Sequence, residues 1–392
     1  MAIKKQGPLR VAILTNIVPR YRTPVFSKLD DDDRFQLKFF VSLPPDFSDP
    51  QAREVLDLQH TKAINFRLGT HTHTKGVVQK EKMPIPLGLL VDLVKHRPDI
   101  IISGDMGVRS LVGLLIARLF RIPLIIWTEE TLEHDIIVSG LQKRLRRFLM
   151  PRADGFLAWG KSASNYLLAN GISEDRITYC AQAVNNEEWS NRAARADSEK
   201  LRRDLKVSGR ICLAVGRLIP RKGFKEMIEA FGALPPHVRK KHSLVLVGDG
   251  PEYQSLARQA NDLGIEHFFM VGSKSPEELA LFYKAADFLI FPSLTDVWGL
   301  VVNEAMACGT PVISSIHAGV TEELVNDTGI GESFDPNDRQ NFTEILTRWL
   351  ESPPEIDEVG PLLAVSGLNF SVTVSAISGL LQKYLRGNGG GS

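Results

Sequence analysis

The feature that most constrains the fold is a stretch in which an apolar run, a polar loop and a helix-forming segment follow one another. Phe288 to Phe291 are apolar and stop at Pro292-Ser293, which indicates a buried strand that ends there. The loop Leu294 to Gly299 leads into Leu300 to Ala307, which are rich in good helix formers. A second apolar run, Val312 to Ser314, follows. Strand, loop, helix and strand in this order predict one βαβ unit of a parallel sheet.

The same alternation recurs along most of the chain. Residues 44–62 interrupt it and are polar and irregular. Short apolar runs that alternate with helix-forming segments favour parallel, doubly wound α/β sheets. The predicted strands are residues 11–15, 35–41, 99–103, 124–127, 155–158, 177–179, 211–215, 244–247, 268–271, 288–291 and 312–314.

A polar, charged segment at residues 185–208 marks the expected boundary between two domains. The 392-residue chain is long enough for two domains of ordinary size. We therefore expect a Rossmann-like N-terminal domain at residues 1–190 and a second one at residues 191–365. The glycine-rich residues 387–392 predict a flexible tail.

Composition limits the classes of protein to consider. The chain is 43% hydrophobic and 24% charged with a net charge of +1, which is typical of a soluble globular protein and does not favour a nucleic-acid partner. Three scattered cysteines, Cys180, Cys212 and Cys308, have no metal-ligand spacing and give no disulfide framework. We find no signal peptide and no apolar run near 18 residues, so we expect a cytoplasmic location.

Charged residues of the second half fall at the predicted carboxyl ends of the strands, where open α/β sheets bind ligands. Arg217 and Lys222 lie in the loop after residues 211–215, and two cations there can neutralise a diphosphate. Asp296 and Glu304 flank a helix N-terminus, whose free N–H groups suit an anion. Carboxylates for hydroxyls and N–H groups for phosphate suit a sugar nucleotide, whereas the alternative for the loop is a solvated basic turn.

Five motifs within residues 211–335 resemble, in order and spacing, the retaining GT-B glycosyltransferases of the large family 4, the glycosyl transferases group 1. The motifs are Gly216-Arg217-x4-Lys222-Gly223, Val247 to Glu252, Ala286 to Ser293, the acid-x7-Glu pair Asp296 and Glu304, and Glu304 to Val312. The resemblance implies two Rossmann-like domains that face a cleft, with a last helix at residues 366–386 that packs back on the first domain. The first half resembles the family only in layout.

The resemblance also implies roles in binding a nucleotide sugar, for which we expect a UDP- or GDP-sugar. With two cations in place we expect no metal, and we expect no cofactor. Arg217 and Lys222 would hold the diphosphate, and Glu304 the ribose hydroxyls. Asp296, where the family usually has glutamate, would contact the transferred sugar, and this departure puts the identity of the donor in doubt. The other implied donor-binding residues, which act through backbone atoms, are Gly216, Gly272, Val297, Trp298, Gly299, Leu300 and Val301.

The first half is expected to supply the acceptor site and a closing loop. Glu129 and Glu130 follow the strand at residues 124–127, where family members often have a histidine. They can accept the acceptor's proton or bind its hydroxyls, and the alternative is an acid pair stabilised by a helix N-terminus. The further candidates are Pro19, Arg20 and Tyr21 after the first strand, Asp105, and His134.

Residues 141–152 contain five basic residues and no acid, with Leu141, Leu145, Phe148 and Leu149 at helical spacing. A basic amphipathic helix can lie on an anionic membrane surface; the alternative is an ordinary packed helix with a solvated basic face. The sequence therefore predicts a glycosyltransferase acting on a glycan or lipid-linked acceptor in bacterial surface polysaccharide assembly. The rival interpretations are a catalytically weak sugar-nucleotide-binding protein and a sugar-nucleotide epimerase of the same fold.

Overall fold

The computed structural model describes residues 7–44, 48–67, 71–72, 78–79, 82–86, 88–136, 138–207 and 209–387. The chain divides into two compact units: unit 1 is Met1–Ala181 with Phe370–Ser392, and unit 2 is Gln182–Asn369. The expected boundary at residue 190 thus differs from the division after Ala181. The polar segment belongs to unit 2 because it forms α8 (Asn186–Ala194) and α9 (Ser198–Asp204), which pack on α13 (Pro276–Ala285).

Within the described residues, unit 1 contains a seven-stranded parallel sheet in the order β11-β10-β9-β8-β1-β2-β3. From β1 the chain adds β2 and β3 on one side, and then returns to add β8, β9, β10 and β11 in turn on the other side. The sheet is therefore doubly wound, as predicted. The strands are β1 (Leu9–Thr15), β2 (Phe35–Val41), β3 (Leu58–His60), β8 (Ile100–Ser103), β9 (Leu124–Thr128), β10 (Gly155–Trp159) and β11 (Ile177–Cys180).

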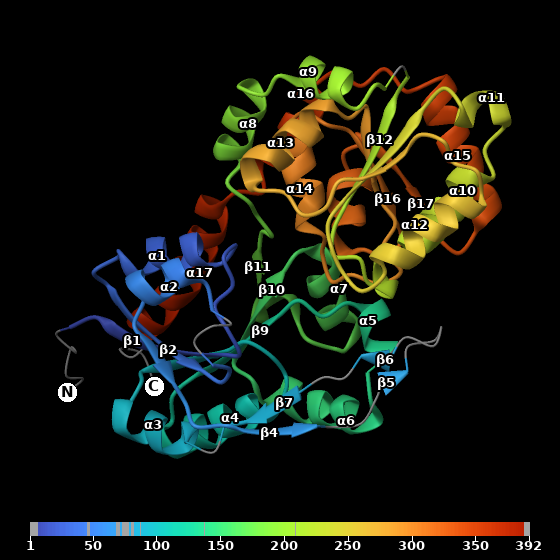
Figure 1. Ribbon diagram of the computed structural model, residues 1–392. Coiled ribbons are helices and arrows are strands. Elements are labelled where there is room, and N and C mark those ends of the chain that lie inside the picture. Colours follow the sequence, from blue (N-terminus) through green and yellow to red (C-terminus); the bar gives the residue numbers. More distant parts are fainter. Residues whose placement is uncertain are drawn as a thin grey trace. The chain divides into compact units, whose positions relative to one another are not determined.

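Helices cover both faces of this sheet (Figure 1). One face packs on α1 (Thr23–Asp30), α2 (Pro50–Val55) and α17 (Phe370–Gly387). The other packs on α3 (Leu89–His96), α4 (Val108–Phe120), α6 (Gly140–Leu149) and α7 (Lys161–Ala169), with the short α5 (Leu132–Ile136) against α7. Two small antiparallel pairs complete the unit: β4 (Ile64–Arg67) with β7 (Lys82–Ile85), and β5 (His71–Thr72) with β6 (Val78–Gln79).

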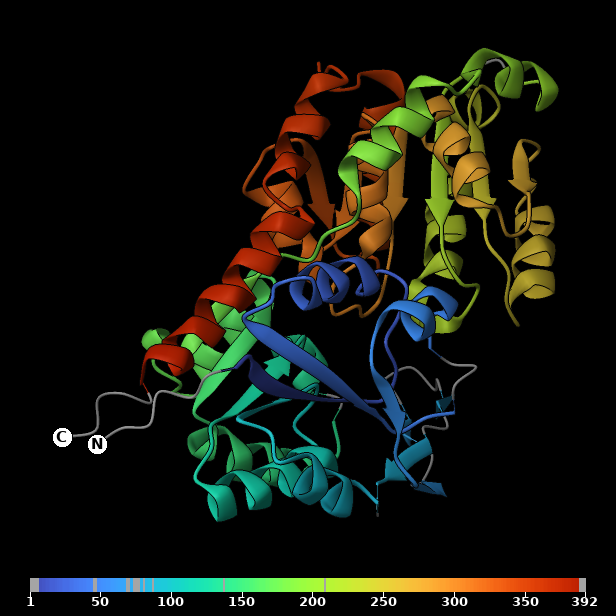
Figure 2. The ribbon, with the colours of Figure 1, turned by 90° about the vertical axis from the view of Figure 1, so that its left-hand side faces the viewer.

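The described part of unit 2 contains a six-stranded parallel sheet in the order β14-β13-β12-β15-β16-β17, shown side-on in Figure 2. Its central strands are buried along their whole length, which is why they appear in the sequence as continuous apolar runs. The strands are β12 (Ile211–Val215), β13 (Ser243–Val247), β14 (Phe268–Met270), β15 (Phe288–Phe291), β16 (Val312–Ser315) and β17 (Gly331–Phe334).

The helices of unit 2 also lie on both faces of the sheet. On one face α10 (Phe224–Gly232), α12 (Tyr253–Asp262) and α15 (Arg339–Glu351) share a core with the strands, and α11 (Pro236–Arg239) packs on α15. On the other, α8, α13, α14 (Leu300–Ala307) and α16 (Val359–Ser366) pack against one another. The helix α13 starts at a capping box formed by Ser275 and Glu278, which satisfies two N-terminal donors.

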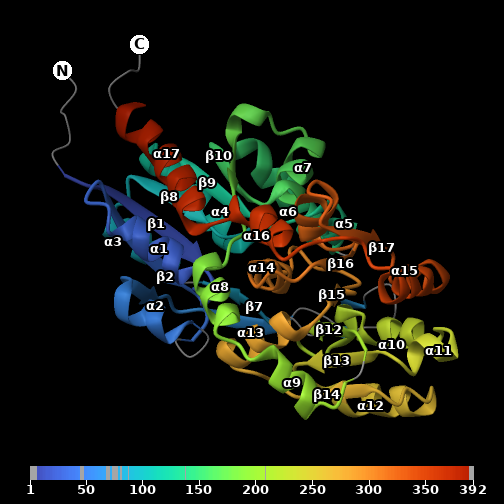
Figure 3. The same cartoon turned by 90° about the horizontal axis from the view of Figure 1, so that it is seen from above.

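The last helix, α17, belongs to unit 1. It lies beside α1 (Figure 3) and buries Ile377, Leu380 and Leu381 in the core. Among the described residues, Val359–Tyr384 is long and apolar enough to cross a membrane by length and composition, although we expected no such run. The structure breaks this segment into α16 and α17, and α17 packs on the sheet.

One further expectation is corrected by the structure. Residues 44–62, predicted to be irregular, contain α2 and β3, and β3 extends the sheet beside β2. The first six residues and residues 388–392 of the predicted tail lie outside the described residues.

Candidate active site

The sheet of unit 2 changes its winding direction between β12 and β15. These strands are neighbours, yet β13 and β14 lie beyond one of them and β16 and β17 beyond the other. The helix after β12 packs on one face and the helix after β15 on the opposite face. The helices after β12 and β15 therefore leave the sheet on opposite faces, and the carboxyl ends of these two strands are the position where such folds bind ligands.

Each of these loops contributes one partner to an ion pair. The Lys222 ammonium nitrogen lies 2.5 Å from the Asp296 Oδ2, and the Arg221 guanidinium reaches the same oxygen at 3.9 Å. The side chains of Lys222 and Asp296 are 16% and 12% exposed, so the pair is largely shielded from water. The ion pair holds a carboxylate and two cations at the carboxyl ends of β12 and β15, where the winding direction of the sheet changes. We call this position the winding reversal. Lys222 and Asp296 were predicted from the sequence, whereas Arg221, which precedes Lys222 in the same turn, was not.

A glycine allows the two loops to approach this closely. Gly223 has a φ of +70°, and a Cβ there would stand 1.9 Å from the carbonyl oxygen of Pro292. The backbone N–H of Leu294 donates to the Arg221 carbonyl at 2.9 Å beside it. Only glycine fits such a contact with a left-handed backbone. The glycine after the lysine is thus needed to join the loops.

A third loop, which the sequence analysis missed, fixes the backbone of Asp296. The Asp296 N–H donates to the His317 carbonyl at 3.1 Å, and the Gly319 N–H donates to the Asp296 carbonyl at 3.1 Å. The His317 ring lies 3.1 Å from a carboxylate oxygen of Asp335. This loop follows β16 and has no distinctive composition. Its two hydrogen bonds keep the acid at one position.

The predicted N–H loop, residues 297–301, separates into two parts. The Trp298 side chain is buried, and its indole N–H donates to Asn303 at 2.8 Å, so it packs in the unit instead of facing a ligand. The Trp298 backbone N–H points to Asp296 Oδ1 at 3.5 Å. The N–H groups of Gly299, Leu300 and Val301, at the start of α14, have no partner among the described residues.

Glu304 is a partly buried carboxylate on the second turn of α14. The Tyr283 hydroxyl donates to its Oε2 at 2.8 Å. Burial raises the pKa of Glu304 to about 7, although the Tyr283 hydrogen bond and the charge of Arg192 lower it. This carboxylate can therefore change its charge near neutral pH. Tyr283, from α13, is a partner that the sequence analysis did not identify.

The remaining predicted donor residues line the same edge of the sheet. Gly216 donates to the Val247 carbonyl at 3.0 Å, and Gly248 donates to the Gly272 carbonyl at 2.9 Å, so the ends of β12, β13 and β14 are level. Arg217 is exposed, and its side chain has no partner in the described part of the chain. It is a cation that a ligand at this edge can recruit.

In unit 1, Glu129 forms an ion pair with Arg22 at the carboxyl ends of β9 and β1. Arg22 is only 1% exposed, and its guanidinium carbon lies 3.1 Å from the centre of the Trp159 ring. The predicted closing residues Pro19, Arg20 and Tyr21 form the turn just before it; Arg20 and Tyr21 are exposed, and Pro19 accepts the Arg22 N–H at 2.9 Å.

Glu130 is engaged in a different network. Its carboxylate contacts His134 Nδ1 at 2.6 Å and Arg146 Nη2 at 2.5 Å, and Arg146 also contacts Asp135 at 2.7 Å. Burial lowers the pKa of Arg146, but the carboxylates and Tyr166 outweigh it, and the net shift is upward. Both oxygens of Glu130 thus have cationic or histidine partners, and the network ties α5 and α6 to β9.

This network removes Arg146 from the basic surface expected for residues 141–152, while the membrane contact itself stays a prediction. Arg146, counted among the basic residues of a membrane-facing helix, is 7% exposed and points into the unit, whereas Leu141 and Phe148 of the expected apolar face are exposed. The helix itself ends at Leu149. The sequence could not decide which basic residue turns inward, because the partners of Arg146 lie 11 and 16 residues away.

Asp105 lies at the winding reversal of the unit 1 sheet, between β1 and β8. It forms an ion pair with Arg109, which is 4% exposed and also donates to the side-chain oxygen of Asn16. Its other carboxylate oxygen accepts the Gly107 N–H at 2.9 Å. The structure thus brings Asp105, Asn16 and Arg109 together, and it places them at the ligand-binding edge of unit 1.

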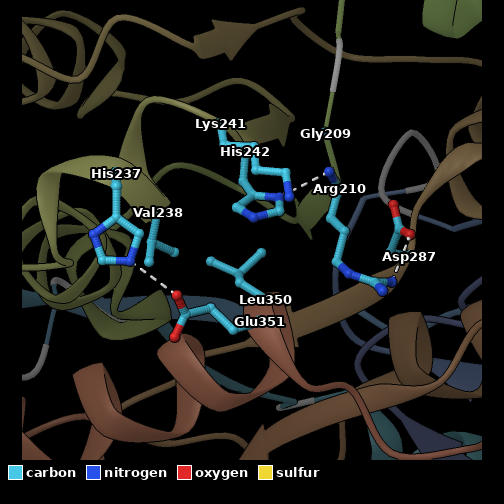
Figure 4. Close-up of a pocket in the computed structure, with 9 residues that line it drawn as sticks. All are labelled: Gly209, Arg210, His237, Val238, Lys241, His242, Asp287, Leu350 and Glu351. Atoms are coloured by element: carbon cyan, nitrogen blue, oxygen red, sulfur yellow. Dashed lines mark hydrogen bonds and ion pairs between the residues drawn. The ribbon is translucent and has the colours of Figure 1, made fainter.

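A separate pocket of about 500 Å³ lies at the opposite, amino end of the unit 2 strands (Figure 4). Most of its charged groups contact one another: Arg210 pairs with Asp287 at 3.2 Å, His237 with Glu351 at 3.0 Å, and His242 accepts the Arg210 N–H at 2.9 Å. It contains none of the predicted residues. Throughout the described residues, no three His, Cys, Asp or Glu side chains gather as a metal-ligand set.

Comparisons with known proteins agree with the predicted fold. A family model described as "Glycosyl transferases group 1" matches residues 197–360. A D-inositol 3-phosphate glycosyltransferase of Corynebacterium glutamicum is 30% identical over 286 residues, 67% of each chain. The chain spans about half the length of the first curated relatives it matches.

Solved structures extend the likeness over the whole chain. HepE of Anabaena in complex with UDP superposes with a TM-score of 0.73 at 19% identity, covering 96% of this chain and all of HepE. The apo lipopolysaccharide outer core galactosyltransferase WaaB gives a TM-score of 0.70 at 16% identity, over 96% and 99% of the two chains. The GT-B fold that the sequence predicted is therefore confirmed.

Proposed function

The chain belongs to the glycosyl transferases group 1, and on this premise we propose that it moves a sugar from a UDP- or GDP-sugar to an acceptor with retention of configuration. The observation that carries the proposal is the convergence of Lys222, Arg221 and Asp296 at the winding reversal of unit 2. Cations beside a carboxylate suit a molecule that joins a diphosphate to a hydroxyl-rich sugar. The complexes of HepE with UDP and UDP-glucose support such a donor.

The cations act on the leaving group. When the bond between the anomeric carbon and the diphosphate breaks, negative charge grows on the departing oxygens. Lys222, Arg217 and Arg221 stabilise this charge together with the N–H groups of residues 299–301 at the start of α14. We propose that these groups do so without a metal or a cofactor. Preorganised donors of this kind typically supply a factor of about 100 to 1,000 each in rate.

The carboxylates orient the donor. Glu304 accepts hydrogen bonds from the ribose hydroxyls when it is ionised, and the base lies near Gly272. Asp296 accepts from hydroxyls of the transferred sugar. Because Lys222 already contacts Asp296 at 2.5 Å, the lysine links the sugar-binding acid to the diphosphate. The contact with Lys222 holds the Asp296 carboxylate in a defined position, although aspartate is one methylene shorter than the glutamate that is usual in the family.

Unit 1 supplies the acceptor site in this proposal. We assign Glu129 to the acceptor hydroxyl because both oxygens of Glu130 are engaged with His134 and Arg146. The acceptor oxygen bonds to the anomeric carbon on the face from which the diphosphate leaves. The acceptor proton passes to the diphosphate oxygen or to Glu129. Asp105 and the turn at residues 19–21 contribute further contacts or close over the donor.

We propose that the acceptor is a glycan or a lipid-linked sugar of bacterial surface polysaccharide. The name of WaaB, a lipopolysaccharide galactosyltransferase, supports this class of acceptor. We further propose a cytoplasmic enzyme that touches an anionic membrane through residues 141–152. Three buried free cysteines suit a reducing compartment.

A donor screen followed by turnover tests the proposal. Binding of the correct nucleotide sugar raises the melting temperature by mass action. Sugar transfer to an acceptor extract is then measured with that donor. Stabilisation by a UDP- or GDP-sugar with acceptor-dependent nucleotide release supports the transferase. Binding without turnover supports the sugar-nucleotide-binding alternative, and conversion of the sugar without an acceptor supports an epimerase.

A further inference from the structure

Three neighbouring helices of unit 1 expose a mixed apolar and basic surface. α4 packs against α3 on one side and α6 on the other, and the three lie along one face of the unit 1 sheet (Figure 1). Their inner sides enter the core, as Leu93, Leu114 and Leu149 show. Their outer sides carry exposed residues, and we call these outer sides together the α3–α4–α6 surface.

This surface holds a concentration of exposed apolar side chains. The described part of the chain has 17 large apolar side chains that are exposed, and eight lie here: three on α3, three on α4 and two on α6. Scattered exposed leucines are ordinary, but a cluster on adjacent elements indicates contact with another apolar phase. The eight are Leu90, Val91, Val94, Leu115, Leu119, Phe120, Leu141 and Phe148.

Basic residues lie beside the exposed apolar residues on the same faces of these helices. Arg118 adjoins Leu115 and Leu119 on α4, and on α6 Arg144 lies between Leu141 and Phe148 at helical spacing. The three helices contain one acid, Asp92, which is partly buried, and a second acid, the exposed Asp154 that follows Arg152, lies 3.8 Å from Arg118. Seven exposed basic residues belong to these helices or directly follow them: Lys95, Arg97, Arg118, Arg121, Arg144, Arg147 and Arg152.

We propose that the α3–α4–α6 surface docks the protein on a bilayer of anionic lipid. Leucine, valine and phenylalanine side chains enter the boundary of the acyl chains, while arginine and lysine extend to the lipid phosphates. The inference deepens the membrane contact proposed above, which rested on residues 141–152 alone, and it does not depend on the donor site. It also accounts for the exposure of Leu141 and of Phe148, whose ring centre lies 4.0 Å from the Arg152 guanidinium carbon within the unit.

The charge of this surface favours a bilayer over a second copy of the chain, and its apolar residues favour a bilayer over a nucleic acid. In a two-fold dimer the same surface would meet itself, and basic residues would oppose basic residues. A nucleic acid would use the basic residues but leave eight apolar side chains exposed. An anionic bilayer satisfies both sets at once.

Vesicle sedimentation tests the proposal with the full-length protein. Wild type should bind vesicles of equimolar phosphatidylglycerol and phosphatidylcholine, and binding should weaken with salt. It should bind far less to phosphatidylcholine alone. The double variant Arg144→Gln/Arg147→Gln, whose side chains have no partner among the described residues, should lose about 30-fold in partition coefficient. A matched control in unit 2, Arg203→Gln/Arg339→Gln, should bind like wild type.

A second pair of substitutions probes the apolar part. Leu115→Ser/Leu119→Ser should lower binding to anionic vesicles on the order of 10- to 100-fold, because two exposed leucines no longer enter the lipid. Circular dichroism checks that the fold is retained.

Three results would overturn the proposal: equal binding to neutral and anionic vesicles, no binding at low salt, or a dimer in sedimentation equilibrium that the leucine substitutions dissociate. Donor turnover in solution is measured on the same samples. If the wild type does not bind vesicles but turns over the donor normally, only the proposed docking surface is refuted. If the wild type shows no turnover, the enzyme assignment is refuted and the docking surface is unaffected.

Discussion

The substitution Glu304→Gln should stabilise the protein while weakening its ligand binding. The pKa of Glu304 is raised by burial from 4.5 to about 7, so the fold favours the protonated acid. The stabilising contribution of that acid is complete below pH 4.5 and is lost as the pH rises through 7. A shift of 2.5 units corresponds to about 3 kcal/mol of stability lost by pH 8. Glutamine keeps the acceptor for Tyr283 and carries no charge.

The free energy of unfolding of unit 2 should therefore depend on pH differently in the two proteins. From pH 5 to pH 8 the wild type should lose about 2.5 kcal/mol relative to Glu304→Gln, roughly 5 to 10 °C in melting temperature for a unit of this size. Urea unfolding at both pH values measures the difference. The exposed Glu355→Gln should follow the wild type.

Donor binding should show the opposite trend. The ribose hydroxyls need an ionised acceptor, and a pKa of about 7 leaves roughly a tenth of Glu304 ionised at pH 6. Wild-type affinity for the donor identified by the screen should fall about 10-fold between pH 8 and pH 6, and affinity of Glu304→Gln should be low at both. A variant less stable than wild type at pH 8, or wild-type binding that ignores pH, would refute the reasoning.

Three further substitutions test other parts of the site. Lys222→Ala should lower turnover by about 100-fold or more, because the leaving diphosphate loses its closest cation, and near-normal steady-state kinetics would contradict that role. Tyr283→Phe should raise the pKa of Glu304 further, because it removes the hydrogen bond that lowers this pKa in the wild type. The pH midpoint of donor binding should then move upward. Gly299→Ala should destabilise unit 2 by roughly 2 to 3 kcal/mol, since φ is +128° and the new Cβ would stand 2.4 Å from the Phe291 ring; an unchanged urea midpoint would exclude this strain.

The double winding of both sheets was predictable because strands buried on two faces leave an unmistakable apolar run. Lys222 and Asp296 could be placed at the same edge of the sheet in advance because each follows a predicted parallel strand. For these two residues, the local sequence pattern and the topology of the sheet both predict a position at the ligand-binding edge.

Partners distant in sequence were not predictable. Arg22 and Glu129 are 107 residues apart, and a pattern of apolar residues contains no information on which arginine will be buried. The same limit applies to Arg146, whose inward turn depends on Glu130 and Asp135. The short elements α2 and β3 were missed because six and three residues are too few to show a period.

The domain boundary illustrates a different limit. Residues 186–194 are polar enough to suggest a linker, yet Trp189 and Ala193 are buried against unit 2. Two apolar side chains at helical spacing are sufficient to attach a helix to a neighbouring surface. Net polarity alone therefore misplaced the division by about nine residues.

The measurement that tests the central claim most directly is hydrogen exchange of the backbone with and without UDP or GDP. If the donor site lies at the winding reversal of unit 2, one nucleotide should slow exchange in residues 216–223, 272–275 and 294–304. Lys222→Ala should reduce that protection. No protection in these loops, or protection instead at the amino-end pocket around Arg210 and His242, would contradict the account.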